Sequence, residues 1–136
     1  MNRFLLKTEP STYSFAQLQK DKKTTWDGVK NPLALKHMGG MKKGDSVLIY
    51  HTGSAREIVG LAQASSDAYP DPKLKNPKRF VVDLIPDRPL KRPLTLAEIK
   101  ADSRFKSFEL VRMGRLSVMP VPPPLWKALL SLAGEA

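Results

Sequence analysis

The segment around Trp26 contains the residue types of a stacking site for a flat ring. Trp26 supplies an indole, and Gly28, two positions later, permits a close approach to the backbone. Stacking of one base on such a ring stabilises binding by about 1–3 kcal/mol. Asn31 adds an amide with both hydrogen-bond donors and an acceptor. The same residues also fit a simpler interpretation, in which Trp26 anchors a loop in the core and Asn31 caps a helix that begins at Pro32.

Two expected strand ends carry further polar side chains. Tyr50, His51 and Thr52 are consecutive, and alternate residues of a strand face opposite sides. Tyr50 and Thr52 can therefore share a face while His51 points away, which makes Thr52 the better candidate for a pocket hydroxyl. The other strand end combines an amine, a hydroxyl and a carboxylate in Lys7-Thr8-Glu9. These three residues fit a buried ion pair that closes the fold as well as they fit contact with a ligand.

The chain is strongly basic. It has 136 residues, with 23 basic and 13 acidic side chains and a net charge of +10, which favours polyanions or anionic surfaces as partners. Residues 1–68 carry 10 basic and 6 acidic side chains and residues 69–136 carry 13 and 7, so the charge belongs to a folded body rather than a tail. The densest basic run, Lys73, Lys75, Lys78 and Arg79, either contacts phosphate or forms a solvated loop.

Residue types that are absent exclude several kinds of site. The sequence has no cysteine, which excludes disulfides, cysteine-based zinc sites and thiol nucleophiles. Its two histidines, His37 and His51, are not closely paired, so no metal site is expected. No apolar stretch approaches the roughly 20 residues that span a bilayer, and the first ten residues lack a signal-peptide core. We therefore expect a cytoplasmic protein with no membrane partner, no metal and no cofactor.

Hydrophobic patterns predict short strands with helices inserted at irregular intervals. The expected strands are Phe4–Lys7, Ser46–His51, Ile58–Ser65, Phe80–Ile85 and Arg115–Val121. The expected helices cover residues 15–21, 33–38, 96–101 and 126–132. This order predicts a single α+β domain over residues 1–136 rather than a doubly wound parallel sheet.

Local signals mark the ends of these helices. Ser14-Phe15-Ala16-Gln17 and Thr95-Leu96-Ala97-Glu98 each match a capping box. Gly39 is expected to end the second helix in the left-handed conformation. Residues 26–31 show no sustained period, so we expect a loop there that carries the ring of Trp26.

Several blocks along the chain resemble one known family. They are Lys7-Thr8-Glu9-Pro10, Tyr13-Ser14, Trp26-Asp27-Gly28-Val29-Lys30-Asn31, Tyr50-His51-Thr52, Tyr69-Pro70-Asp71 and Arg115-Leu116-Ser117-Val118. In this order they resemble the EVE domain family from residue 4 to about residue 130. The resemblance implies a PUA-like mixed β-barrel of five to six strands with short peripheral helices, related to YTH domains. It also implies noncatalytic binding of a modified base, methylated or otherwise altered, that is flipped out of DNA or RNA.

Together with the residue chemistry above, the resemblance leads to two expected sets of site residues. The ligand-binding set is Lys7, Thr8, Tyr13, Trp26, Gly28, Val29, Asn31, Tyr50 and Thr52. The phosphate-contacting set is Lys30, Lys73, Lys75, Lys78, Arg79 and Arg115. A monomer is assumed, with a nucleic acid that carries a modified base as its partner.

The sequence departs from the family pattern at four positions. Phe4 and Phe80 stand where tryptophan is frequent, and Thr52 replaces a serine, so these three keep the type of side chain. Lys30 replaces an arginine, and a flexible point charge there replaces a planar fork that can bind phosphate at two points. The role of Lys30 therefore stays open.

An enzymatic alternative comes from a related fold. ASCH-type proteins share the PUA-like barrel, and some resemble amidohydrolases that act on modified nucleosides through threonine, lysine and glutamate. Thr8, Lys7 and Glu9 supply these residue types. They are consecutive in an extended segment, so Lys7 and Glu9 would face one side and Thr8 the other, which is a poor arrangement for activating the hydroxyl.

Overall fold

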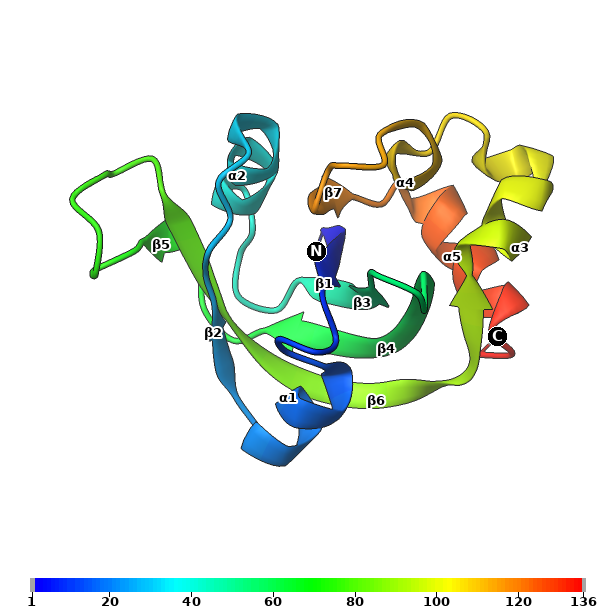
Figure 1. Ribbon diagram of the computed structural model, residues 1–136, viewed down its shortest axis with the longest axis horizontal. Coiled ribbons are helices and arrows are strands. Elements are labelled where there is room, and N and C mark those ends of the chain that lie inside the picture. The colour runs from blue at the N-terminus through cyan, green and yellow to red at the C-terminus, as the bar shows by residue number, and fades with distance from the viewer. Residues whose placement is uncertain (1, 136) are drawn as a thin grey trace.

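One curved mixed sheet forms a half-barrel with short helices at its edges and ends (Figure 1). The computed structural model describes residues 2–135. The strands are β1 (Arg3–Thr8), β2 (Thr24–Trp26), β3 (Ser46–His51), β4 (Glu57–Ala64), β5 (Tyr69–Pro70), β6 (Phe80–Thr95) and β7 (Val118–Pro120). The helices are α1 (Phe15–Asp21), α2 (Pro32–Gly39), α3 (Leu96–Ala101), α4 (Glu109–Arg112) and α5 (Pro123–Leu132), with a 3-10 turn η1 (Ser103–Phe105). The strand order is β2-β6-β4-β3-β1-β7, with β5 paired to β6, so the predicted α+β class and small mixed barrel are confirmed.

Strands β1 and β3 form a parallel pair, and β1 lies between β3 and the edge strand β7. Leu5 and Leu48 lie opposite each other in this pair and are almost fully buried. Apolar runs of this kind form strands that are covered on both faces. The same register places Lys7 beside Tyr50, which brings together the two strand ends that carry polar side chains.

Strand β6 is much longer than the sequence predicted. The expected strand Phe80–Ile85 continues to Thr95, although it contains three prolines. Pro86 and Pro89 pair with β4 where the register of the two strands shifts. Proline cannot donate a ladder hydrogen bond, and such irregularities tolerate the missing donor.

Trp26 lies at the end of a strand, so the prediction of a loop at this residue is wrong. β2 pairs antiparallel with β6 and places Trp26 opposite Val82. The strand has three residues, which is too short for alternation to show in the sequence. The loop begins after Trp26 and continues to Asn31, which is the N-cap of α2.

The predicted N-terminal caps of the helices are confirmed, with one correction. The Ser14 hydroxyl accepts from the Gln17 amide at 3.0 Å, but the Gln17 side chain donates to Asp21 at 2.8 Å instead of reaching back. The cap of α1 is therefore single rather than reciprocal. The second box is complete, because Thr95 and Glu98 each accept from the other's backbone.

Helix α2 does not end as predicted. Gly39 is the last helical residue, and the following Gly40 has φ −88°, so neither glycine is left-handed. Gly39 serves a different purpose, since a Cβ at this position would lie 3.0 Å from the Phe80 ring. The missing side chain lets the ring of Phe80 pack directly on the helix.

The C-terminal part contains more helix and less strand than expected. The predicted strand Arg115–Val121 is reduced to β7, and Arg115 lies outside it. η1 and α4 were not predicted, because segments of three and four residues are too short for a helical period. No helix within residues 2–135 is long and apolar enough to cross a membrane.

Candidate functional site

A cleft opens between β2, the end of β1 and the segment that leads into α1. Its volume is about 580 Å³, and we call it the main cleft. It is lined by Lys7, Thr8, Glu9, Thr12, Tyr13, Thr24, Thr25, Trp26, Asp27, Gly28, Val29, Lys30 and Ser117. Six of the nine residues in the predicted ligand-binding set are therefore brought together here: Lys7, Thr8, Tyr13, Trp26, Gly28 and Val29.

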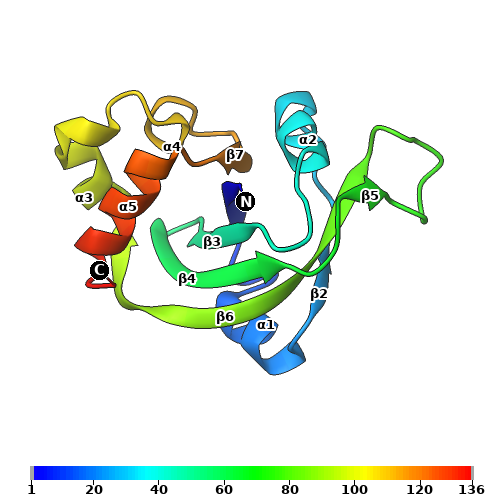
Figure 2. The same ribbon diagram turned by 180° about the vertical axis from the view of Figure 1, so that it is seen from behind.

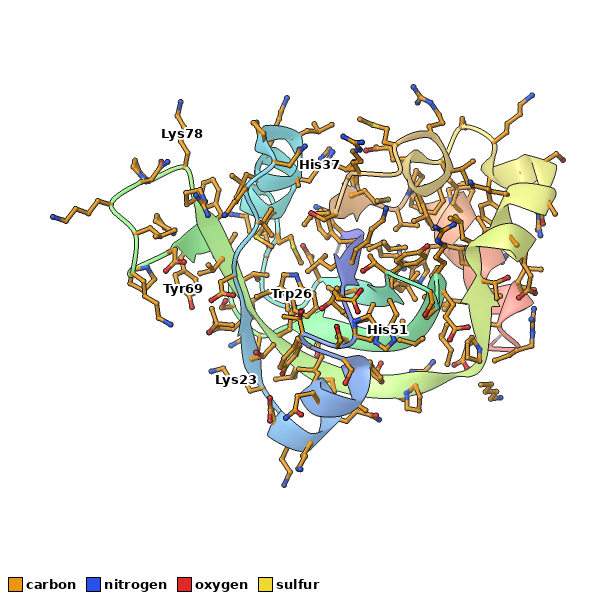
Figure 3. The ribbon with its side chains drawn as sticks, in the orientation of Figure 1. Lys23, Trp26, His37, His51, Tyr69 and Lys78 are labelled. Carbon is orange, nitrogen blue, oxygen red and sulfur yellow. The ribbon has the colours of Figure 1, made fainter. Side chains whose placement is uncertain are left out.

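Trp26 belongs to both the core and the wall of the main cleft. Only 9% of its surface is exposed, and it packs within the hydrophobic core. Tyr13 meets it edge to face, with ring centroids 6.2 Å apart and planes at 88°. The Tyr13 hydroxyl donates to Asp21 of α1 at 2.9 Å, which holds the tyrosine in place. The two interpretations of Trp26 from the sequence are thus compatible (Figure 3).

The polar groups of residues 8–9 are held by local hydrogen bonds. The Thr8 hydroxyl donates to the Tyr13 carbonyl at 2.6 Å. The Glu9 carboxylate accepts from the backbone amide and the hydroxyl of Ser11, at 3.1 and 2.9 Å. The backbone hydrogen bond from Ser11 contributes most to lowering the pKa of Glu9, so this group stays ionised well into the acid range. Glu9 therefore keeps a negative charge at the cleft.

Lys7 lines the cleft with its ammonium group only partly satisfied. Its Nζ donates to the Gly114 carbonyl at 3.0 Å and lies 5.4 Å from the centroid of the Tyr50 ring. Burial lowers the pKa of Lys7 from its usual value. No carboxylate within residues 2–135 forms an ion pair with it. Since an ammonium has three donors, Lys7 retains capacity to donate to a ligand.

Three residues of the predicted ligand-binding set do not line the main cleft. The side-chain oxygen of Asn31 accepts from the Ala34 amide at 3.0 Å, which makes it the N-cap of α2. Tyr50 is 3% exposed and lies beneath Lys7. The Thr52 hydroxyl lies 3.3 Å from both a Glu9 carboxylate oxygen and the Thr8 carbonyl, and so contacts two residues that line the cleft. Direct contact of these three residues with a ligand stays a prediction.

The predicted phosphate-contacting residues fall into three places. Lys30 lines the main cleft and also a neighbouring one, which Lys78 and Arg79 line too. Arg115 lines a separate hollow together with Asn31. Lys73 and Lys75 are exposed on the loop before β6 and line neither cleft. Only part of the basic run therefore borders a cleft.

The sequence reasoning missed five residues that line the main cleft. They are Thr12, Thr24, Thr25, Asp27 and Ser117. Asp27 and Ser117 stand inside blocks that carry the family resemblance, so that signal could have found them. Thr24 and Thr25 belong to β2, and they could not be placed while that strand was unrecognised.

His51 has a structural role. Its Nε2 accepts a hydrogen bond from the Phe15 amide at 3.0 Å, which joins the start of α1 to the end of β3. Burial lowers the pKa of His51, an effect opposed by the charges of Glu57 and Glu9. A neutral ring that accepts from the backbone follows from both observations. No group of three metal-ligating side chains occurs among the described residues of the chain.

Comparison with known proteins identifies relatives over nearly the whole chain. The model of the EVE domain matches residues 2–132. Thymocyte nuclear protein 1 of Rattus norvegicus is 32% identical over 165 residues, which cover 96% of this chain and 73% of the relative. An NMR structure of a Rhodopseudomonas palustris protein is 39% identical, with a TM-score of 0.93 over 98% of this chain and 94% of that chain. The crystal structure of human THYN1 in complex with DNA containing 5-methylcytosine is 29% identical, with a TM-score of 0.88 over 100% of this chain and 99% of that chain.

A more distant likeness concerns the fold alone. An ASCH protein of Zymomonas mobilis has a TM-score of 0.63 at 13% identity, over 96% of this chain and 95% of that chain. Together with the structures above, this likeness confirms the predicted PUA-like fold.

Proposed function

The chain belongs to the EVE domain family, and on that premise we propose that it binds DNA at a modified base without chemical turnover. One base, flipped out of its stack, occupies the main cleft against Trp26. The human relative that was crystallised with DNA containing 5-methylcytosine makes this base the first ligand to test.

The observation that carries the proposal is the aromatic wall beside a cleft of sufficient size. The volume of about 580 Å³ is within the usual range for small-ligand sites. The indole of Trp26 is held by the core and by its contact with the Tyr13 ring, so little conformational entropy is lost when a base stacks on it. Stacking on one aromatic side chain contributes about 1–3 kcal/mol.

The polar lining is suited to an amino-bearing base. The carboxylates of Glu9 and Asp27 line the cleft and can accept from an exocyclic amino group, as carboxylates do from cytosine N4. The ammonium of Lys7 can donate to a ring nitrogen or a carbonyl oxygen. Cytosine presents both kinds of group on one edge, which supports a cytosine derivative as the ligand.

The free energy available from one methyl group limits the expected selectivity. A buried methyl contributes about 0.8 kcal/mol, which is about fourfold in affinity. Flipping a base costs a few kcal/mol, an amount comparable with one stacking partner. Contacts with the phosphates must therefore supply much of the net affinity, in keeping with the charge of +10.

The arrangement of residues 7–9 supports binding rather than hydrolysis. The Thr8 hydroxyl donates to a backbone carbonyl, Lys7 donates to the Gly114 carbonyl and Glu9 is held by Ser11. Among the described residues, neither Lys7 nor Glu9 has a side-chain hydrogen bond to Thr8 that would activate it as a nucleophile.

Fluorescence of Trp26 tests the proposal directly. The chain has two tryptophans, and Trp126→Phe leaves Trp26 as the only indole. Trp126 belongs to α5 and packs in the core, so phenylalanine retains most of its packing. We expect DNA containing 5-methylcytosine to quench the emission in a saturable manner, at a lower concentration than the same DNA with cytosine.

Two controls complete the experiment. RNA of the same sequence shows which nucleic acid is preferred. Analysis of the recovered nucleosides detects turnover, and conversion of any of them would favour the amidohydrolase alternative. Equal affinity for modified and unmodified DNA, with no change in the emission of Trp26, would contradict the proposed function.

A further inference from the structure

A second cleft lies beside the main cleft, between α2 and the loop that connects β5 to β6. Its volume is about 470 Å³, and we call it the cationic cleft. It is lined by Lys30, Pro32, Leu35, Lys36, Asn76, Lys78, Arg79 and Phe80. Figure 3 shows the Lys78 side chain extending outward from the loop between β5 and β6. All four of its ionisable lining residues are basic, and they come from two stretches of the chain, residues 30–36 and 76–80.

The charges of the cationic cleft have no ion-pair partner in the described part of the chain. Lys30, Lys36, Lys78 and Arg79 form no salt bridge within residues 2–135. Other cations of the chain do find partners, as Arg92 does with Glu98 at 2.6 Å. Like charges gathered around one hollow repel each other, and a bound anion relieves that repulsion. Charge complementarity therefore indicates a polyanion as the occupant.

Hydrogen bonds within the loop hold the backbone that carries its cations. Asp71 is buried and accepts from the Lys73 amide at 2.9 Å, and Asn76 accepts from the Lys78 amide at 3.0 Å. The Arg79 amide donates to the Asn76 carbonyl at 3.1 Å. Lys78 and Arg79 are thus presented from a structured loop, which lowers the entropy lost when they bind.

The floor of the cationic cleft is apolar. Leu35 is buried, and the half-buried ring of Phe80 packs on Gly39 of α2, where a Cβ would lie 3.0 Å from the ring. An aromatic face among cations matches a nucleotide, which combines a flat base with a phosphate. A simple inorganic anion has no flat apolar group that could pack against the ring of Phe80.

Lys30 connects the two clefts, because it lines both of them. We propose that the cationic cleft binds the nucleotide next to the modified base, with its phosphate on the lysines and its base or sugar against Phe80. This inference rests on the proposed function, since the modified base in the main cleft determines which nucleotide is the neighbour. Base recognition is thereby assigned to the main cleft and backbone binding to the cationic cleft.

A charge-matched pair of double variants tests this division. Lys36→Ala/Lys78→Ala removes two cations of the cationic cleft. The control Lys100→Ala/Lys127→Ala removes two exposed lysines from α3 and α5, at the opposite end of the molecule from the cationic cleft (Figure 2). All four side chains are exposed, so both proteins should fold, and thermal unfolding checks that they do.

Two probes separate the clefts. The first is a single-stranded oligonucleotide with one 5-methylcytosine, and the second is the free nucleoside 5-methyl-2′-deoxycytidine. We expect Lys36→Ala/Lys78→Ala to weaken oligonucleotide binding several-fold. The slope of log affinity against log salt should fall by about 0.7 for each lost phosphate contact. Affinity for the nucleoside should be unchanged, and the control double variant should lower the slope less.

Each possible result decides between the two proposals. Oligonucleotide affinity equal to that of the control double variant would overturn the role of the cationic cleft, while a retained preference for the methylated base would leave the proposed function standing. The opposite result has two parts: Lys36→Ala/Lys78→Ala weakens oligonucleotide binding, but the wild-type protein binds methylated and unmethylated DNA equally. It would support the role of the cationic cleft and overturn the proposed function. No oligonucleotide binding by the wild-type protein would overturn both.

Phe80 provides an independent arm of the test. Phe80→Leu keeps an apolar side chain against Gly39 but removes the aromatic face. We expect an affinity loss of about fivefold or more for the oligonucleotide, and none for the free nucleoside. An unchanged affinity would restrict the cationic cleft to phosphate and overturn the contact with Phe80.

Discussion

The main cleft and the cationic cleft share Lys30, but they use their side chains in opposite ways. In the main cleft most polar groups already have protein partners, as with Thr8 and the Tyr13 carbonyl or Glu9 and Ser11. In the cationic cleft the charged groups have no ionic partner among the described residues. The polar groups of the main cleft are therefore pre-organised without a ligand, whereas the cations of the cationic cleft gain ionic partners only when an anion binds.

This difference indicates how the work of binding is divided. Pre-organised groups discriminate between ligands, because a wrong ligand leaves buried polar atoms unpaired. Surface cations without ionic partners attract the phosphates of a nucleic acid whatever its sequence, and this binding weakens as the salt concentration rises. Variants of the main cleft should therefore change stability and selectivity together, whereas variants of the cationic cleft should change only affinity and its dependence on salt.

The largest expected effect is that of Trp26→Ala. Because Trp26 is 9% exposed, this change should lower the free energy of unfolding by about 3–5 kcal/mol and also remove the stacking surface. Chemical denaturation measures the first effect and nucleoside binding the second. Trp26→Phe is the matched control, and it should retain most of the stability and part of the binding. A Trp26→Ala protein as stable as the wild type would show that the ring is not part of the core.

The next effect is that of Thr8→Val, which keeps the shape of the side chain and removes its hydrogen bond to the Tyr13 carbonyl. We expect a loss of about 0.5–1.5 kcal/mol in the free energy of unfolding, with weaker binding of the modified base. Thr12→Val is the control, since its hydroxyl has no protein partner within residues 2–135. Equal stability of the two variants would show that the Thr8 hydroxyl does not organise the cleft.

A smaller effect is expected in the pH dependence of stability, through His51. Burial lowers the pKa of His51 in the folded protein, so the unfolded chain binds more protons as the pH falls below about 6.5. The free energy of unfolding should therefore decrease on acidification from pH 8 to pH 5. His51→Gln keeps an acceptor for the Phe15 amide but does not titrate, so its stability should depend less on pH over this range. Identical pH profiles would contradict the role assigned to His51.

The smallest effect is expected at a lysine outside both clefts. Lys75→Ala should leave oligonucleotide affinity within about twofold of the wild type, because an exposed charge at a distance is screened by salt. Lys78→Ala on the same loop should weaken binding more and reduce the salt slope. Equal effects of the two changes would show that the loop acts through its total charge and not through the cationic cleft.

Features that depend on a few neighbouring residues could be predicted from the sequence. The caps at Ser14, Asn31 and Thr95 were correct, because each is a hydrogen bond to an amide three residues away. The apolar runs that form β1 and β3 were correct for a similar reason, since their composition requires burial. The predicted left-handed end of α2 was wrong, because Gly39 is still helical and lies against the ring of Phe80, a residue distant in the sequence.

The sequence alone determined the fold class, the strands β1 and β3, the positive charge and, through the family resemblance, most of the residues that line the main cleft. Only the tertiary structure decided that Trp26 ends a strand, and that Lys36 and Lys78 meet around one hollow. The physical reason is the sequence separation of the residues that interact. Caps and apolar runs are set by interactions within a few residues, whereas a cleft is the space left when a curved sheet and its helices pack together. Its position depends on strand pairings between distant segments, and no local pattern encodes them.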